Sequence, residues 1–179
     1  MRKGAQRLTY LAVFIALNVV LARIASLRLV FAGVEGIRIG LGGLPVIMAG
    51  VLWGPVAGGI VGAMGDMIGY FLNPAGPYMP HFTLSAALTG VIPALVLRIL
   101  GREKSPGPGA LMLAILVGQT ITSLILVPYF LQTLFGIPWR PLLVARVVSQ
   151  AINFPAYAFI IHTLVRRLGL LFGFGWFSS

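Results

Sequence analysis

The sequence IGLGGLPVIMAGVLWGPVAGGIVGAMG, residues 39–65, carries no charged side chain over 27 positions. A helix that crosses a bilayer needs about 20 mostly apolar residues, so this stretch is long enough to enter a membrane. Its middle contains WGPVAGG, residues 53–59, in which glycine and proline favour a turn. We therefore predict two short helices joined by a tight turn, over residues 40–54 and 56–72.

Further uncharged runs lie on both sides of this stretch. They cover residues 8–22, 67–97, 105–139 and 147–165. Such runs predict membrane-spanning helices over 8–25, 82–100, 109–132 and 142–166. The predicted fold is an all-α membrane protein, a bundle of six transmembrane helices with a long loop between helices 1 and 2. We expect residues 1–179 to form a single integral membrane domain.

The composition supports a membrane protein and excludes other classes. Of the 179 residues, 59% are hydrophobic and 9% are charged, and the mean hydropathy is +1.00. A soluble domain carries about 25% charged residues, and a disordered chain combines low hydrophobicity with high charge. Cysteine is absent, which excludes disulfides and thiol chemistry. The length suits five or six spans rather than a large transporter.

The net charge of +10 comes mainly from arginine, without the lysine-rich runs of a nucleic-acid binder. Short loops on the cytoplasmic side of a membrane are enriched in basic residues. If both termini are cytoplasmic, the inner side holds Arg2, Lys3, Arg7, Arg98, Arg102, Lys104, Arg166 and Arg167. The outer side then holds Arg23, Arg28, Arg38, Arg140 and Arg146. This bias favours cytoplasmic termini.

The outer arginines are the informative set, because only Glu35 is available there to offset them. Each arginine on its own could simply extend to the membrane interface. For the whole set we prefer a cationic extracytoplasmic cavity that binds an anion.

Asp66 lies in the middle of a predicted helix, in GAMGDMIGYF, with no other acidic residue between Glu35 and Glu103. A carboxylate at membrane depth costs roughly 2.5–3.5 kcal/mol unless it is paired or hydrated. An internal ion pair with an arginine is one explanation, and a proton or sodium site is another. The third is a ligand contact, since a carboxylate accepts two parallel hydrogen bonds from an amino-heterocycle.

The segment NPAGPYMPHFTLS, residues 73–85, contains three prolines and a glycine that exclude a regular helix. We predict a rigid extracytoplasmic loop that lines a cavity, although a plain turn with interfacial aromatic residues has a similar pattern. Aromatic faces come from Tyr78, His81 and Phe82, and hydrogen bonds from Asn73 and Thr83.

Two helical patterns indicate interior packing. Arg146, Gln150 and Asn153 share one face of the last helix, and we expect this polar stripe to face the bundle interior. Small residues spaced by four allow helices to approach closely in lipid. This pattern occurs at Gly58, Gly62, Gly65 and Gly69, where we expect internal packing. It recurs at Ala12 and Ala16, which either pack internally or dock a partner helix.

The sequence shows no means of covalent chemistry. It contains no Walker A pattern, no His/Cys/acid cluster with metal-ligand spacing and no plausible Ser/His/Asp set. We therefore expect no catalytic residues, no metal and no cofactor, so that the chain is not an enzyme.

The order of these motifs resembles the S-components of energy-coupling factor (ECF) transporters. The resemblance covers nearly the whole chain, through Ala12 and Ala16, then ARIASLRL at 22–29, then the run from residue 38 to residue 90. The most specific part, residues 65–90, looks most like the folate family. His81 is a departure, because the family often carries glycine there.

The resemblance implies a multi-pass protein of the cell membrane with both termini cytoplasmic. Such a subunit binds a vitamin near the outer face, under the loop between helices 1 and 2. Its partners are a transmembrane T-component and two ATP-binding subunits, and Ala12 and Ala16 match the docking motif for the T-component. The bound subunit topples in the membrane and releases its cargo inside.

The expected function is therefore folate binding for ATP-driven uptake. Asp66 or Asn73 would pair with the pterin amino edge, and Tyr78 and Phe82 would stack on its ring. The arginines would meet the carboxylates. The full expected substrate site is Arg23, Arg28, Arg38, Asp66, Asn73, Tyr78, His81, Phe82, Thr83, Arg146, Gln150 and Asn153. The alternatives are another anionic vitamin such as pantothenate, or a non-transport membrane protein, either an enzyme or an assembly factor.

Overall fold

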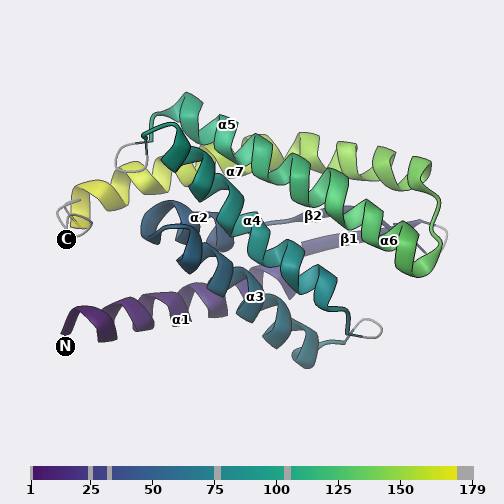
Figure 1. Ribbon diagram of the computed structural model, residues 1–179, viewed down its shortest axis with the longest axis horizontal. Helices are drawn as coiled ribbons and strands as arrows, with labels where there is room; N and C mark the ends of the chain where they lie inside the picture. Colours follow the sequence, from purple (N-terminus) through teal and green to yellow (C-terminus); the bar gives the residue numbers. More distant parts are fainter. Residues whose placement is uncertain (1, 24–25, 32–33, 75–77, 103–105, 173–179) are drawn as a thin grey trace.

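The structure is a computed structural model that describes residues 2–23, 26–31, 34–74, 78–102 and 106–172. Helices dominate it, as the sequence predicted (Figure 1). The elements in chain order are α1 Arg2–Arg23, β1 Ser26–Phe31, β2 Val34–Gly40, α2 Gly43–Trp53, α3 Pro55–Leu72, α4 Pro80–Ile99, α5 Pro108–Gln119, the π-helix η1 Thr120–Leu126, α6 Val127–Phe135 and α7 Trp139–Phe172.

The four central helical segments follow the predicted boundaries to within about three residues, whereas α1 begins six residues before its predicted start and α7 ends six residues beyond its predicted end. Because α5, η1 and α6 form one continuous rod, Pro108–Phe135, the described chain has six helical segments, and the predicted bundle is confirmed. Five of these segments are long and apolar enough to cross a membrane, and α2 is a shorter apolar helix of 11 residues. The third helix, predicted to be short, reaches 18 residues.

The predicted loop between the first two helices contains a β-hairpin, which the sequence analysis did not anticipate. β1 pairs with β2 in antiparallel register, from Ser26 opposite Gly40 to Phe31 opposite Val34. The sequence SLRLVF alternates polar and apolar residues at its start and ends in β-branched and aromatic ones, which is a pattern typical of a strand. Backbone pairing within the hairpin satisfies polar groups that an irregular loop near lipid would leave exposed.

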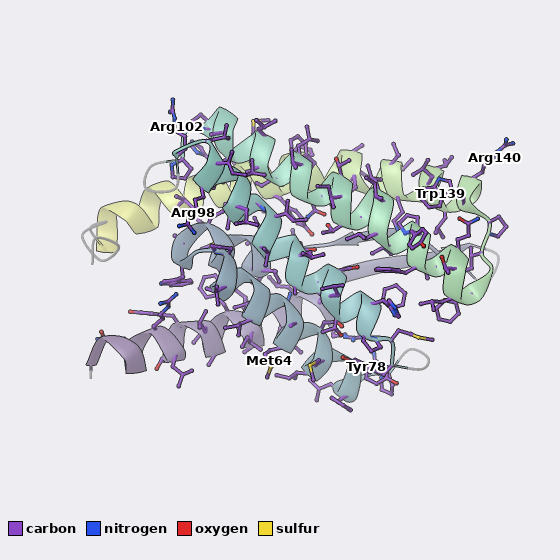
Figure 2. All side chains as sticks on the ribbon, viewed as in Figure 1. Met64, Tyr78, Arg98, Arg102, Trp139 and Arg140 are labelled. Atoms are coloured by element: carbon purple, nitrogen blue, oxygen red, sulfur yellow. The ribbon has the colours of Figure 1, made fainter. Side chains whose placement is uncertain are left out.

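Successive helices run in opposite directions, so the bundle has two distinct ends (Figure 1). The start of α1 and the last turns of α7 lie at one end, which we call the terminal end. Arg98 and Arg102 lie there as well, whereas Tyr78, Trp139 and Arg140 lie toward the other end, here called the hairpin end (Figure 2). An even number of helical segments places both ends of the chain on one side of the bundle.

The turn between α2 and α3 is the tight one that the sequence predicted. α2 ends at Trp53 and α3 begins at Pro55, with Gly54 between them at a φ of 90°. Only glycine adopts this conformation without strain. Proline suits the first position of a helix because its missing N–H has no partner there in any case.

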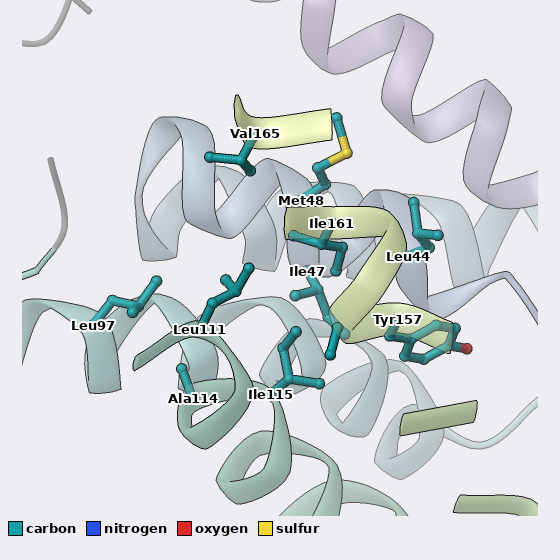
Figure 3. Packing of buried hydrophobic residues seen from close by; sticks show 11 residues of the cluster. Leu44, Ile47, Met48, Leu97, Leu111, Ala114, Ile115, Tyr157, Ile161 and Val165 are labelled. Carbon is teal, nitrogen blue, oxygen red and sulfur yellow. The ribbon is translucent and has the colours of Figure 1, made fainter. Parts of the chain in front are cut away.

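Two kinds of packing hold the helices together. A cluster of branched side chains, including Ile47 of α2, Ile115 of α5 and Ile161 of α7, is fully shielded from solvent (Figure 3). Glycines bring α2, α3 and α4 into backbone contact, since a β-carbon on Gly58 would lie 2.7 Å from the carbonyl oxygen of Gly90. The expectation of internal packing for the α3 glycines is confirmed, because all four are buried.

Candidate functional site

A cavity of about 420 Å³ lies between α1, α3, α4, the α5–α6 rod and α7. Many polar side chains line this cavity, although the chain is rich in apolar residues. The polar, charged and aromatic side chains that line it are Asn18, Arg23, Asp66, Tyr70, Tyr78, Phe82, Ser85, Thr89, Gln119, Thr122, Ser123, Phe135, Arg146, Ser149, Gln150, Asn153 and Tyr157. Polar groups that are costly in a membrane therefore gather around one internal space.

Two of the predicted arginines, Arg23 and Arg146, line this cavity from α1 and α7. Arg23 lies at the end of α1, and its Nη1 donates a hydrogen bond of 3.0 Å to the carbonyl oxygen of Asn73 after α3. Gly69 makes room for this guanidinium, because a β-carbon there would lie 2.9 Å from Arg23 Nε. In the described lining, two guanidinium groups face one acidic residue, Asp66, so the cavity is suited to an anion.

Asp66 lies in a short chain of hydrogen bonds. Thr83 donates to Asp66 Oδ2 at 2.7 Å, and the Tyr78 and Thr83 hydroxyl oxygens lie 3.0 Å apart. Since Thr83 has one hydroxyl proton and gives it to the carboxylate, Tyr78 is the donor to Thr83. The partner that the structure gives Asp66 is thus a hydroxyl group, and the predicted ion pair with an arginine stays a prediction, since the side chains of Arg28 and Arg38 lie outside the described part of the structure. Oδ1 remains available to a ligand.

Aromatic rings stand close to this chain of hydrogen bonds. Tyr70, Tyr78 and Phe82 all line the cavity. The rings of Tyr70 and Tyr78 lie 5.2 Å apart between centroids, at 59° to one another. Their flat apolar faces can hold a planar ring, as aromatic pairs do in protein interiors.

The polar stripe of α7 faces the interior, as its spacing predicted. Arg146, Gln150 and Asn153 line the cavity together with Ser149 and Tyr157. Ser149 is 2% exposed and Asn153 is 7% exposed. Across the cavity wall, Gln150 Nε2 donates to Gln119 Oε1 of α5 at 3.3 Å.

Three predicted residues lie near the cavity but not in its lining. Asn73 is exposed and contributes its backbone carbonyl to Arg23. His81 is exposed, with its ring 5.0 Å from that of Phe130. Thr83 acts through its hydrogen bond to Asp66.

The side chains of two further predicted residues, Arg28 and Arg38, lie outside the described part of the structure. Their backbones stand opposite each other in the hairpin.

Sequence reasoning missed several uncharged polar residues of the lining. Asn18 of α1 is 7% exposed, and its Nδ2 donates a 2.6 Å hydrogen bond to the carbonyl oxygen of Gly42, just before α2. The Tyr157 hydroxyl donates to the carbonyl oxygen of Gly40. Gln119 is 6% exposed. A lone amide within a long apolar helix is the signal that could have identified Asn18 and Gln119, because such groups usually face a bundle interior.

The small residues of α1 lie elsewhere. Ala12 and Ala16 are exposed, as are the larger apolar side chains Val13, Leu17 and Val20. Internal packing within this chain is therefore excluded for the two alanines, and a partner helix remains the prediction.

A bundle of apolar helices around a polar, net-cationic cavity defines a solute-binding membrane protein. The profile of the "ECF-type riboflavin transporter, S component" family matches residues 3–169 of the chain. The chain therefore belongs to the S-component family of ECF-type transporters, and it is a multi-pass membrane protein.

Two of the similar proteins in this family are FolT proteins. The chain is 34% identical over 172 residues to the folate transporter FolT of Clostridium novyi (strain NT), with 94% of this chain and 95% of the relative covered. It superposes with a TM-score of 0.75 and 27% identity on a crystal structure of FolT bound with folic acid, covering 90% of this chain and 94% of the other. The S component of a bacterial ECF transporter, at 18% identity and a TM-score of 0.69 with 95% and 99% covered, shows the same fold.

Proposed function

We propose that this chain is the folate-binding S-component of an ECF-type importer. The observation that carries the proposal is the cavity, in which Arg23 and Arg146 supply positive charge and Tyr70, Tyr78 and Phe82 supply ring faces. Folate combines a planar pterin with an anionic glutamate tail, so it needs both features at once. The similarity to a folate transporter and to a FolT structure with folic acid supports this choice of ligand.

The proposed roles follow from the geometry of each group. The guanidinium groups of Arg23 and Arg146 bind the carboxylates of the tail, for which their paired N–H donors are suited. Asp66 accepts a hydrogen bond from the exocyclic amino group of the pterin through Oδ1, since Oδ2 already accepts one from Thr83. The aromatic rings pack against the face of the pterin.

We place the hairpin end at the outer face and both termini in the cytoplasm. By the grouping made from the sequence, more basic residues belong to the terminal end than to the hairpin end, in agreement with the enrichment of basic residues in cytoplasmic loops. The chain itself does no chemistry in this proposal. A transmembrane T-component docks on the exposed face of α1 around Ala12 and Ala16, and two ATP-binding subunits supply the energy for release of the ligand into the cytoplasm.

Isothermal titration of the purified chain in detergent with folic acid tests the proposal. We expect saturable one-to-one binding. The matched control is Arg140→Met, an exposed arginine outside the cavity lining, which should bind as the wild type does. Absence of saturable binding by the wild type would rule out folate as the ligand.

Riboflavin is the second candidate, because the matching family profile carries its name. Riboflavin has a planar ring but no negative charge, and it would leave both guanidinium groups in the cavity without an anionic partner. A competition titration with folic acid, riboflavin and pantothenate separates these cargoes. Displacement of folic acid by riboflavin at equal concentration would favour the second candidate.

A further inference from the structure

The π-helix η1 interrupts the rod of α5 and α6 where this rod forms a wall of the cavity. It covers Thr120–Leu126, and the N–H of Val127 donates to the carbonyl oxygen of Thr122, five positions earlier. An α-helical turn closes over four positions instead. The wide turn therefore accommodates an extra residue, and turns of this kind are rare and frequent at functional sites.

The extra residue changes which side of α6 faces the cavity. Each residue of an α-helix advances about 100° around the helix axis. Counted from Gln119, which lines the cavity, an unbroken α-helix would place Phe135 about 160° away, on the opposite side of the rod. One extra residue turns the following helix back by about 100°, so η1 brings Phe135 to within about 60° of Gln119.

The lining of the cavity follows this altered register. Beyond η1, the rod lines the cavity at every fourth position, through Val127, Leu131 and Phe135. An unbroken helix would instead direct Phe130 and Leu134 toward the cavity, at about 20° and 60° from Gln119. Neither of these two side chains belongs to the lining. The wide turn thus decides which face of α6 a ligand meets.

The chemistry of the wall changes along the rod. Its lining is polar up to Ser123 and apolar beyond it, in α6, which lies toward the hairpin end (Figure 1). Leu131 is half-buried and Phe135 is 46% exposed, so both keep surface that a ligand can cover. Covering apolar surface in this way removes it from water and favours binding.

A proline offers a purely structural explanation of η1. Pro128 has no N–H to donate, and its ring conflicts with the carbonyl group four positions earlier in an ordinary helix. A wide turn relieves this conflict. On that explanation alone, the choice of face has no consequence for binding, and Leu131 and Phe135 could be changed freely.

We propose that η1 turns α6 so that Val127, Leu131 and Phe135 form an apolar subsite for the benzoyl ring of folate. This inference rests on the proposed function and adds to it. The pterin edge needs hydrogen-bonding partners such as Asp66, and the glutamate tail needs guanidinium groups. The benzoyl ring between them has only carbon atoms in its ring, so a wall without polar side chains covers it and leaves no polar group unpaired.

The first test measures the dissociation constant of folic acid for two matched pairs of variants. Leu131→Ala and Phe135→Ala each remove apolar lining and should raise the constant roughly 5- to 30-fold. Leu134→Ala and Phe130→Ala remove the same side chains from the face that an unbroken helix would present. These controls should stay within about 2-fold of the wild type, because they remove no surface that the ligand covers. Circular dichroism checks that each variant is folded.

The second test reports on the benzoyl ring itself rather than on affinity. Folic acid that carries fluorine on this ring is bound to each protein, and the fluorine NMR shift of the bound ligand is recorded. The shift should differ from that of the wild type in Leu131→Ala and Phe135→Ala, because the surroundings of the ring change. It should match the wild type in the two controls.

The outcomes separate the two levels of inference. If the wild type does not bind folic acid, the proposed function fails and the subsite falls with it. If folic acid binds but Leu131→Ala and Phe135→Ala keep the wild-type constant, the subsite is refuted and η1 only accommodates Pro128. If the control pair loses affinity instead, the ligand meets the other face of α6 and the inference is wrong. A loss of affinity without a change in the fluorine shift would overturn the assignment to the benzoyl ring.

Discussion

The substitution Gly58→Ala tests the close contact of α3 with α2 and α4 that the fold requires. A β-carbon on Gly58 would lie 2.7 Å from the carbonyl oxygen of Gly90 and 2.8 Å from the α-carbon of Gly50. Both obstacles are backbone atoms, and ordinary contacts at a β-carbon are 3.4–4 Å. The added methyl group therefore forces whole helices apart rather than moving one flexible side chain.

The expected loss is the difference between two effects. Inserting a methyl group into a packed interior costs about 1–3 kcal/mol, and the backbone obstacles here place Gly58→Ala in the upper part of that range. Alanine in a helix gains about 1 kcal/mol over glycine. We therefore expect a net loss of about 1–2 kcal/mol in the free energy of unfolding. For a chain of this size, this corresponds to a melting temperature lowered by roughly 2–8 °C.

Thermal unfolding of the detergent-purified protein, followed by circular dichroism, measures the effect. The control is Gly59→Ala at the next position, where a β-carbon would meet only the Val91 side chain, at 3.0 Å. That contact requires one side-chain methyl group to shift by a few tenths of an ångström and no backbone to move, so Gly59→Ala should melt within about 2 °C of the wild type or slightly higher, because of its helix propensity. A Gly58→Ala protein as stable as the wild type would show that the helices do not meet through their backbones.

Three further predictions concern binding and partners. Arg146→Met should weaken folic acid binding roughly 10- to 100-fold by titration, since it removes a charged hydrogen-bond donor from the cavity, and an equal affinity would show that this guanidinium does not meet the ligand. Thr83→Val should raise the dissociation constant of folic acid about 3- to 10-fold, because Asp66 loses the donor that orients it. An unchanged dissociation constant would show that Asp66 does not contact the ligand. Ala16→Leu should leave folic acid binding intact and abolish co-purification with the T-component, and a stable complex would place the docking face elsewhere.

The predictions from the sequence agree with the structure where the free-energy cost of placing a side chain in lipid decides its position. The uncharged runs predicted the helices, and the dipeptide Gly54–Pro55 predicted the tight turn. The stripe through Arg146 and Asn153 was predicted to face inward because a polar group in an apolar helix has few other places to go. The hairpin was predicted only as a long loop, although Ser26–Phe31 begins with the period of two that is typical of a strand.

The partners of individual polar groups could not be predicted in this way. Asp66 is bonded to Thr83, 17 positions along the chain, and Asn18 is bonded to the backbone of Gly42, 24 positions along. Such pairs depend on how α1, α3 and α4 cross, and the crossing depends on which glycines allow backbone contact. Residue spacing within one helix carries no information about the helix on the other side.

The sequence by itself determined that this chain is a membrane protein built as a helical bundle. Its long apolar runs with few charges leave no other stable arrangement. It also predicted a set of arginines at the end where the ligand enters in our proposal, of which Arg23 and Arg146 line the cavity. Only the tertiary structure decided which of those charges share a cavity, and which amides of different helices meet across its wall, as Gln119 and Gln150 do. The reason is that a cavity is formed by residues far apart in the chain, and their meeting is set by helix packing rather than by any local pattern.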